Sequence, residues 1–215
     1  MVKKKIEISA YARNNQIASQ NRKFFYDNGI FSINIIGSPG CGKTSILEYM
    51  ASNFEHSFGV IIGDVKTALD ADRIIRAGNN FSYPIETGGG CHISSSMIKD
   101  KLEVIETDIE YLFIENVGNL VCPSSFDLGE NFKVAVLSIP EGDEKVRKYP
   151  TLFLKSDAVI INKIDLLDYM DYDIDRVEED CRIHNPKVQI FKTSVKTGAG
   201  FPEWFDFLTN KRKHF

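Results

Sequence analysis

The sequence predicts an α/β fold in which helices flank a doubly wound, mainly parallel sheet. Two observations lead to this prediction. Short runs of β-branched and aromatic residues recur along the chain, as expected for buried strands. Most segments between these runs are long enough for a crossover helix, and alternating strands and helices produce parallel sheets.

The first expected element is a helix over residues 6–28. This segment is rich in helix formers, carries apolar positions at Ile17, Phe24 and Phe25, and stops at Gly29, a common residue just after a helix. We therefore expect an N-terminal helical extension over residues 1–29 and a single domain over residues 30–215.

The remaining elements alternate through that domain. Strands are expected where the apolar runs are short, and helices where the intervening segments are long. The expected strands are residues 31–36, 59–62, 111–114, 134–139, 158–161 and 188–191. The expected crossover helices are residues 44–53, 68–77, 94–102, 174–183 and 202–210.

Composition and charge exclude several classes of function. The chain has 215 residues, of which 43% are hydrophobic, and 26 basic against 30 acidic residues give a net charge of −4. This balance gives no support to a nucleic-acid or anionic-membrane partner. No signal-peptide core or long apolar stretch is present, so we expect a cytoplasmic protein. The four cysteines are too sparse for a disulfide framework and are expected to be reduced thiols.

A phosphate-binding loop follows the first expected strand. Residues 37–44 match the pattern Gly-x-x-x-x-Gly-Lys-[Ser/Thr], with a strand before and a helix after, as the motif requires. Backbone N–H groups would surround phosphate oxygens, Lys43 would reach the β- and γ-phosphates, and the Thr44 hydroxyl would hold Mg²⁺. The candidate phosphate contacts are Gly37, Ser38, Pro39, Gly40, Cys41, Gly42, Lys43, Thr44 and Ser45. Cys41 is interpreted as a small side chain whose backbone does the binding.

The nucleotide is predicted to be GTP rather than ATP. Asn162-Lys163-Ile164-Asp165 follows an expected strand and resembles the guanine-specificity motif of GTPases. Asp165 can accept two hydrogen bonds from guanine, Lys163 can cover the ring, and Asn162 can brace the loops. Adenine lacks those two donors and would leave the carboxylate unpaired. A segment after the last strand resembles the final GTPase loop, which adds the candidate base contacts Ser194, Val195 and Lys196.

Carboxylates at strand ends are candidates for magnesium binding and catalysis. Asp64 and Glu115 each follow an apolar strand, where a carboxylate can reach the magnesium side of the phosphate site. Asp70 could orient the attacking water, and the Gly118 amide could sense the γ-phosphate. Asp64 could instead cap a turn, and Asp70 could be a first-turn helix acid. Slow GTP hydrolysis is expected from the candidate catalytic residues Lys43, Asp64, Asp70 and Glu115, with magnesium held by Thr44, Asp64 and Glu115.

A second candidate site consists of Cys91, His92 and Cys122. Two thiolates and an imidazole suit nickel, zinc or similar ions far better than magnesium. The set is incomplete for a closed structural zinc site, so water or a second copy of the chain could complete it; a two-fold axis nearby would bring together four thiolates. From spacing alone, free cysteines are more often small buried apolar residues, and that alternative stays open here.

These motifs together resemble the HypB family of hydrogenase maturation GTPases. The similarity extends from about Asn14 to the C-terminus. The most diagnostic segment is residues 115–123, because the related urease accessory GTPase has a different segment there with a Cys-Pro-His motif, whereas Ser124 follows Pro123 here. Further matching segments are Asn21-Arg22 and residues 37–44, 63–65, 87–92, 141–143, 148–150 and 161–166.

The resemblance implies a GTP-dependent metallochaperone. Members of this family form a GTP-dependent homodimer, hold nickel or zinc at the dimer interface, and deliver nickel to the large subunit of nickel-iron hydrogenase. They work with a small zinc-containing accessory protein of the same pathway. Cys91, His92 and Cys122 match the family's metal residues by position. The first thirty residues lack the cysteine-rich or histidine-rich nickel motif of many relatives, so we expect no high-affinity nickel site there.

Three alternatives remain from the sequence. The first is a urease-directed nickel chaperone of the same GTPase class, disfavoured by residues 115–123. The second is a non-catalytic metal-binding scaffold whose nucleotide is structural. The third is a small-molecule ATP kinase, which residues 162–165 argue against.

Overall fold

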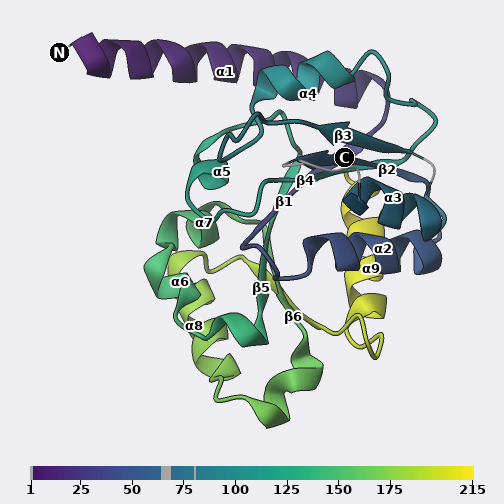
Figure 1. Ribbon diagram of the computed structural model, residues 1–215, viewed down its shortest axis with the longest axis vertical. Coiled ribbons are helices and arrows are strands. Elements are labelled where there is room, and N and C mark those ends of the chain that lie inside the picture. The colour runs from purple at the N-terminus through teal and green to yellow at the C-terminus, as the bar shows by residue number, and fades with distance from the viewer. Residues whose placement is uncertain (1, 64–68, 80) are drawn as a thin grey trace.

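The computed structural model describes residues 2–63, 69–79 and 81–215 (Figure 1). Its centre is a seven-stranded sheet with the strand order β3-β2-β4-β1-β5-β6-β7, and every neighbouring pair is parallel. The predicted α/β class with a mainly parallel, doubly wound sheet is confirmed. The strands are β1 (Phe31–Gly37), β2 (Phe58–Gly63), β3 (Ser82–Ile85), β4 (Tyr111–Glu115), β5 (Phe132–Ser138), β6 (Ala158–Asn162) and β7 (Gln189–Thr193).

Strand β3 was not predicted from the sequence. It has four residues, contains Pro84 and lies at the sheet edge, where it pairs only with β2. An edge strand is buried less deeply than a central one and tolerates proline, because one row of its backbone groups needs no partner. The apolar run that marked the other strands is therefore missing here.

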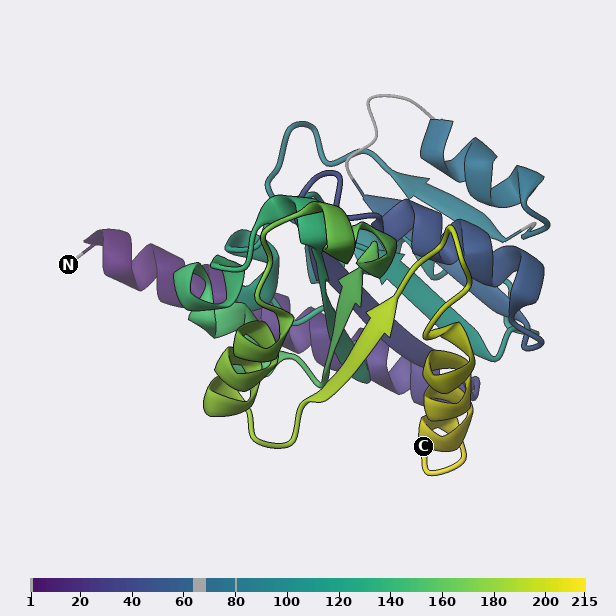
Figure 2. The same cartoon turned by 90° about the horizontal axis from the view of Figure 1, so that it is seen from below.

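Helices cover both faces of the sheet (Figures 1 and 2). One face packs against α2 (Lys43–Asn53), α3 (Leu69–Arg76) and α9 (Phe201–Arg212) in a single apolar core. The other face has two cores. One includes residues of α1 (Val2–Asp27) and α4 (Ser95–Lys101), and the other includes residues of α6 (Lys145–Lys148), α7 (Pro150–Lys155) and α8 (Ile174–His184).

The short elements follow strand ends. They are α5 (Cys122–Ser125) and the 3₁₀ turns η1 (Ile139–Glu141) and η2 (Ile164–Tyr169). Neither α5 nor the short helices α6 and α7 were predicted, since so few residues cannot display a helical period. Among the described residues, no helix is both long and apolar enough to cross a membrane.

Parallel strands bring the candidate nucleotide residues to one edge of the sheet. The phosphate loop follows β1, Glu115 ends β4, Asn162 ends β6, and Ser194 follows β7. In an open parallel sheet the carboxyl ends of the strands form the ligand-binding edge. The fold therefore gathers side chains from four separate segments around the N-terminus of α2.

Candidate functional site

The phosphate loop connects β1 directly to α2. Gly40 and Gly42 have φ angles of 79° and 100°, a left-handed conformation that favours glycine. A Cβ at Gly42 would also overlap the side-chain amide of Asn162. Lys43 is buried, and its Nζ donates to the carbonyl oxygens of Gly37 at 3.1 Å and Ser38 at 3.2 Å. The loop is thus curled around its own lysine.

Cys41 packs against the inside of the loop. The side chain is fully buried, and a Cβ at Gly37 would lie 2.6 Å from its sulfur. Burial raises the pKa of the Cys41 thiol to about 11, so it stays neutral at physiological pH. The geometry agrees with the interpretation that Cys41 is a packing residue whose backbone serves the loop.

The structure brings Thr44 and Glu115 together from α2 and β4. The Thr44 hydroxyl donates to Glu115 Oε1 at 2.7 Å. The other carboxylate oxygen, Oε2, is buried with no hydrogen-bond partner among the described residues. Burial raises the pKa of Glu115, although nearby Lys43 and the Thr44 hydroxyl act in the opposite direction. A hydroxyl beside a carboxylate oxygen that lacks a partner is an oxygen donor set that fits Mg²⁺.

Asp70 lies in the first turn of α3. Its Oδ1 accepts from Arg73 at 3.0 Å, and the same guanidinium donates to Glu48 on α2 at 2.7 Å. Asp70 and Arg73 are both close enough to affect the pKa of Glu115. Arg73 was not singled out in the sequence and joins α3 to the helix of the phosphate loop. The prediction for Asp64 lies outside the described residues.

The loop after β4 contacts the phosphate loop at Gly118. A Cβ at Gly118 would lie 2.8 Å from the ring of Pro39 and 3.1 Å from its backbone nitrogen. Only glycine permits so close an approach of the two backbones. The candidate phosphate sensor and the phosphate loop are therefore in direct contact.

The candidate guanine-binding residues meet beside the phosphate loop. Asn162 is buried and donates to the carbonyl oxygen of Cys41 at 3.1 Å, while Lys163 Nζ donates to Gly40 O at 2.6 Å. The Ser194 hydroxyl donates to Asp165 Oδ1 at 2.5 Å, which holds the loop after β7 against the loop after β6. Val195 and Lys196 continue that second loop. Asn162 therefore links the end of β6 to the phosphate loop.

Two of the candidate metal residues, Cys91 and His92, lie in the loop between β3 and α4, and the third, Cys122, is the first residue of α5. The ligand atoms of Cys91, His92 and Cys122 all lie within 4.8 Å of one another. Cys91 is exposed, whereas His92 and Cys122 are partly exposed, so an ion could enter and leave. The thiol of Cys91 raises the pKa of Cys122 by hydrogen bonding, and burial lowers the pKa of His92. Lower basicity favours the neutral imidazole, the form that binds metals.

A buried amide joins the two candidate sites. Asn116 directly follows Glu115, and its Oδ1 accepts from the backbone N–H of Ile93, the residue after His92, at 3.1 Å. Its Nδ2 donates to Asn34 on β1 at 3.2 Å. Ile93 is fully buried, and its side chain also lies against Gly63, where a Cβ would be 2.6 Å away. Asn116 was not predicted from the sequence, although a polar residue at the end of a buried strand is a signal of such a role.

These features define a P-loop nucleotide-binding protein: the phosphate loop, the contact between Thr44 and Glu115, and the loops at the strand ends. Residues 31–192 match the family described as "CobW/HypB/UreG, nucleotide-binding domain". The Escherichia coli (strain K12) hydrogenase maturation factor HypB is 40% identical over 210 residues, which are 96% of this chain and 72% of that protein. The chain therefore belongs to the HypB family of hydrogenase maturation factors.

Further comparisons agree in sequence and in structure. The Helicobacter hepaticus hydrogenase/urease maturation factor HypB is 39% identical over 217 residues, covering 98% of this chain and 89% of that protein. The crystal structure of HypB from Helicobacter pylori in complex with nickel superposes with a TM-score of 0.90 at 37% identity, over 94% of this chain and 96% of that one. HypB from Archaeoglobus fulgidus gives a TM-score of 0.86 at 38% identity, over 94% and 99%.

Proposed function

We propose that this protein is a GTP-hydrolysing metallochaperone that supplies nickel to the large subunit of nickel-iron hydrogenase. In this proposal it works in the cytoplasm as a GTP-dependent homodimer, together with the small zinc-containing accessory protein of the pathway. The observation that carries the proposal is the Cys91, His92 and Cys122 cluster, whose ligand atoms lie within 4.8 Å in a chain that also has a phosphate-binding loop.

GTP binding would use the loops around the N-terminus of α2. The backbone N–H groups of residues 37–45, except Pro39, which has none, and the ammonium of Lys43 would bind the phosphates. Asp165 and Lys163 would select and cover guanine, while Asn162 braces the phosphate loop. The loop after β7, with Ser194, Val195 and Lys196, would complete the base pocket.

Hydrolysis would depend on positioning and charge neutralisation. Thr44 and Glu115, together with Asp64, would hold magnesium; the Glu115 Oε2 atom, buried and without a partner among the described residues, supports this assignment. Bound magnesium would supply neutralisation of the phosphate charge. Asp70 would orient the attacking water, and the Gly118 amide would contact the γ-phosphate. Slow turnover is expected, because phosphoryl transfer needs further stabilising groups that a partner could provide.

Nickel would be the cargo of the second site. Thiolates and imidazole bind Ni²⁺ and Zn²⁺ in preference to hard cations, so zinc would be a competitor at the same residues. Three ligands from one chain leave a coordination position open, which suits an ion that must be handed on. A two-fold pairing of this surface would bring a second set of thiolates nearby.

Ile93 supports a link between nucleotide state and metal binding. It follows a metal-binding candidate and contacts Gly63 at the end of β2 and Asn116 at the end of β4. Ordering of these strand ends by GTP would shift the loop that carries Cys91 and His92. Hydrolysis would then loosen the dimer and release the ion.

Nickel binding in two nucleotide states tests the proposal. Ni²⁺ affinity and stoichiometry are measured by competition with a chromophoric chelator, in the presence of GDP or a non-hydrolysable GTP analogue, with mass determination by light scattering. We expect dimers with the analogue and an affinity that differs at least about fivefold between the states. Equal affinities in both states would refute the switch, and unchanged binding by Cys122→Ser would refute the site.

Urease is a second candidate client. The Helicobacter hepaticus relative is described as a hydrogenase/urease maturation factor, and it aligns with 98% of this chain. Transfer of bound nickel to the hydrogenase large subunit and to the urease apoprotein can be compared side by side. Preferential transfer to the hydrogenase subunit supports the main proposal, and preferential transfer to urease reverses it.

A further inference from the structure

Helix α1 makes hydrogen bonds to two segments that lie next to the candidate metal ligands: the start of α4 and the loop after α5. The Asn14 side chain donates to the carbonyl oxygen of Asp127 at 2.8 Å and accepts from the backbone N–H of Ser95 at 3.1 Å. The Asn21 side chain donates to the carbonyl oxygens of Ser95 and Leu128, both at 2.9 Å. Ser95 lies just after His92 in sequence, and Asp127 lies shortly after Cys122. One helix therefore fixes the spacing of two loops that are far apart in the chain.

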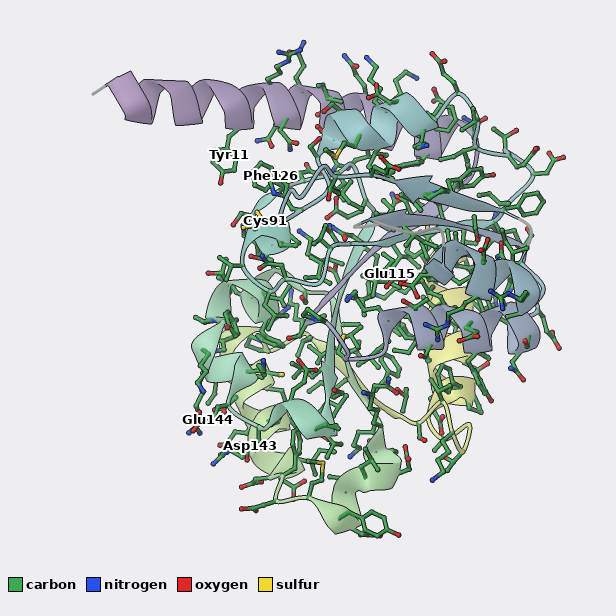
Figure 3. The ribbon with its side chains drawn as sticks, viewed as in Figure 1. Tyr11, Cys91, Glu115, Phe126, Asp143 and Glu144 are labelled. Carbon is green, nitrogen blue, oxygen red and sulfur yellow. The ribbon has the colours of Figure 1, made fainter. Side chains whose placement is uncertain are left out.

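An aromatic stack leads from α1 to the imidazole of His92. The ring of Tyr11 stacks on Phe126 with centroids 5.0 Å apart and an interplanar angle of 22°. Phe126 stacks in turn on His92 at 3.8 Å and 18°. Figure 3 shows Tyr11, Phe126 and Cys91 in succession below α1. The plane of the candidate ligand ring is thus set by a column of rings that begins on α1.

Stacking on Phe126 orients the His92 ring, a role that a hydrogen bond from the second ring N–H usually has in metal-binding histidines. A metal-binding histidine generally donates its second ring N–H to a carboxylate or carbonyl, which fixes the ring orientation. Among the described residues, the His92 ring has a hydrogen-bond contact only with the thiol of Cys91, at 3.5 Å from Nδ1. Its orientation therefore depends on Phe126, and this orientation directs Nδ1 toward the thiol cluster.

We propose that Phe126 and Tyr11 are positioning residues of the metal site, acting through the imidazole of His92. This inference rests on the proposed function, because it assigns a role in metal binding. The rings are poorly placed for a purely structural role, since Tyr11 is 43% exposed and Phe126 is only partly buried. Helix α1 is in this view part of the metal site.

A double-mutant cycle tests whether Phe126 acts through His92. Ni²⁺ affinity is measured for Phe126→Leu, His92→Ala and the double variant, with thermal unfolding recorded for each. Phe126→Leu should weaken nickel binding by about tenfold. The double variant should bind no more weakly than His92→Ala alone, because the ring has nothing left to orient. The proposal would be overturned if the losses of Ni²⁺ affinity in the two single variants multiply in the double variant. It would also be overturned if Phe126→Leu leaves the Ni²⁺ affinity unchanged.

Tyrosine variants and cobalt spectra provide the second test. Tyr11→Ala should weaken Ni²⁺ binding by about threefold, and Tyr11→Phe should leave it unchanged, because the ring and not the hydroxyl carries the effect. Tyr26→Ala is the matched control, since Tyr26 is on the same helix, is 69% exposed and packs against Phe215. With Co²⁺, Phe126→Leu should keep thiolate charge-transfer bands while its ligand-field bands shift toward those of His92→Ala. Equal losses in Tyr11→Ala and Tyr26→Ala would contradict the assignment.

Two failures can be told apart. If the wild type binds nickel through Cys122 and Phe126→Leu changes nothing, the stack is only structural and the proposed function stands. If the wild type binds no nickel, or Cys122→Ser binds as tightly as the wild type, the proposed metal site fails and the role of Phe126 fails with it.

Discussion

The phosphate loop and the candidate metal site are constructed in different ways. The phosphate loop is one continuous segment whose shape comes from its own glycines and from the strand and helix that it connects. The candidate metal site consists of side chains from the loop before α4 and from the start of α5, and a third segment, α1, makes hydrogen bonds to residues next to both. A local motif specifies the first site, whereas tertiary contacts specify the second. Substitutions far from the ligands should therefore matter more for metal than for nucleotide.

The two sites meet at the ends of β2 and β4. Asn116 accepts from Ile93 N and donates to Asn34, and Asn34 donates in turn to the buried Glu130 at 3.1 Å. Glu130 accepts from the backbone N–H of Leu128, in the loop that follows α5. Breaking buried hydrogen bonds of this kind costs free energy. A shift of one of these residues should therefore move its hydrogen-bond partners as well.

Removing the loop lysine should have the largest effect. Lys43→Ala should reduce GTP turnover by about a thousandfold, because it removes the ammonium proposed to neutralise phosphate charge. Nickel affinity without nucleotide should not change, since the metal site does not depend on this residue. Single-turnover hydrolysis measures the first effect, and exposed Lys187→Ala is the control. Turnover independent of Lys43 would favour a scaffold with a structural nucleotide.

Exchanging Asp165, the carboxylate proposed to bind guanine, should have the next largest effect. Asp165→Asn should weaken GTP binding by about a hundredfold, because an amide N–H would face the guanine donors. The same variant should gain affinity for xanthosine triphosphate, which presents a carbonyl in place of the guanine amine. Competition with a fluorescent nucleotide measures both, with exposed Asp168→Asn as the control. A variant that keeps its preference for guanine would show that Asp165 does not read the base.

Removing the side-chain amide of Asn116 should reduce the dependence of nickel affinity on nucleotide state. It should change GTP binding and nickel binding themselves much less. Asn116→Ala should bring the difference in nickel affinity between GDP and GTP-analogue states below about twofold, compared with at least about fivefold in the wild type. Asn79→Ala is a matched control, because Asn79 is also a buried amide that binds backbone, through Phe58 and Phe81, at the other end of β2. Equal loss of coupling in both variants would indicate general destabilisation.

The sequence predicted the local parts of this molecule well. The positions of six strands along the chain, the crossover helices and the phosphate loop each depend on patterns within a short segment. The prediction of guanine binding also depends on four adjacent residues placed after a strand, and it stays a prediction. The edge strand β3 escaped prediction, because Pro84 and its partial exposure remove the apolar pattern.

The contacts that organise the metal site could not be predicted from the sequence. Cys91, His92 and Cys122 were candidates by residue type, but nothing in their spacing indicated that α1 would hold their loops. Phe126 and Tyr11 look like ordinary aromatic residues until the fold stacks them on His92. Asn116 and Arg73 likewise gain their roles from partners that are distant in sequence. Such pairings depend on tertiary packing and not on local periodicity.

The smallest predicted effect is a change in the stability of the nucleotide-free protein when Glu115 is replaced by glutamine. Burial raises its pKa, so the native state binds the proton more tightly than the unfolded state does. The resulting contribution to stability is fully present below the unfolded-state pKa, about 4.3, and is lost as pH rises through the higher native value. Glu115→Gln removes the buried charge and keeps an oxygen that can accept from Thr44. It should therefore stabilise the nucleotide-free protein by about 1 kcal/mol at pH 8 and have little effect at pH 4.

Urea unfolding at both pH values measures this difference, and exposed Glu103→Gln is the control. The same Glu115→Gln variant should lose magnesium-dependent GTP turnover, because a neutral amide is a weak ligand for a hard cation. A gain in stability accompanied by a loss of activity would indicate that the carboxylate is kept for function at the expense of the fold. Nickel affinity without nucleotide should stay unchanged, because Glu115 is not among the candidate nickel ligands and the Asn116 contact with Ile93 is kept. Equal stability of wild type and variant at pH 8 would mean that the buried carboxylate carries no cost in the free protein.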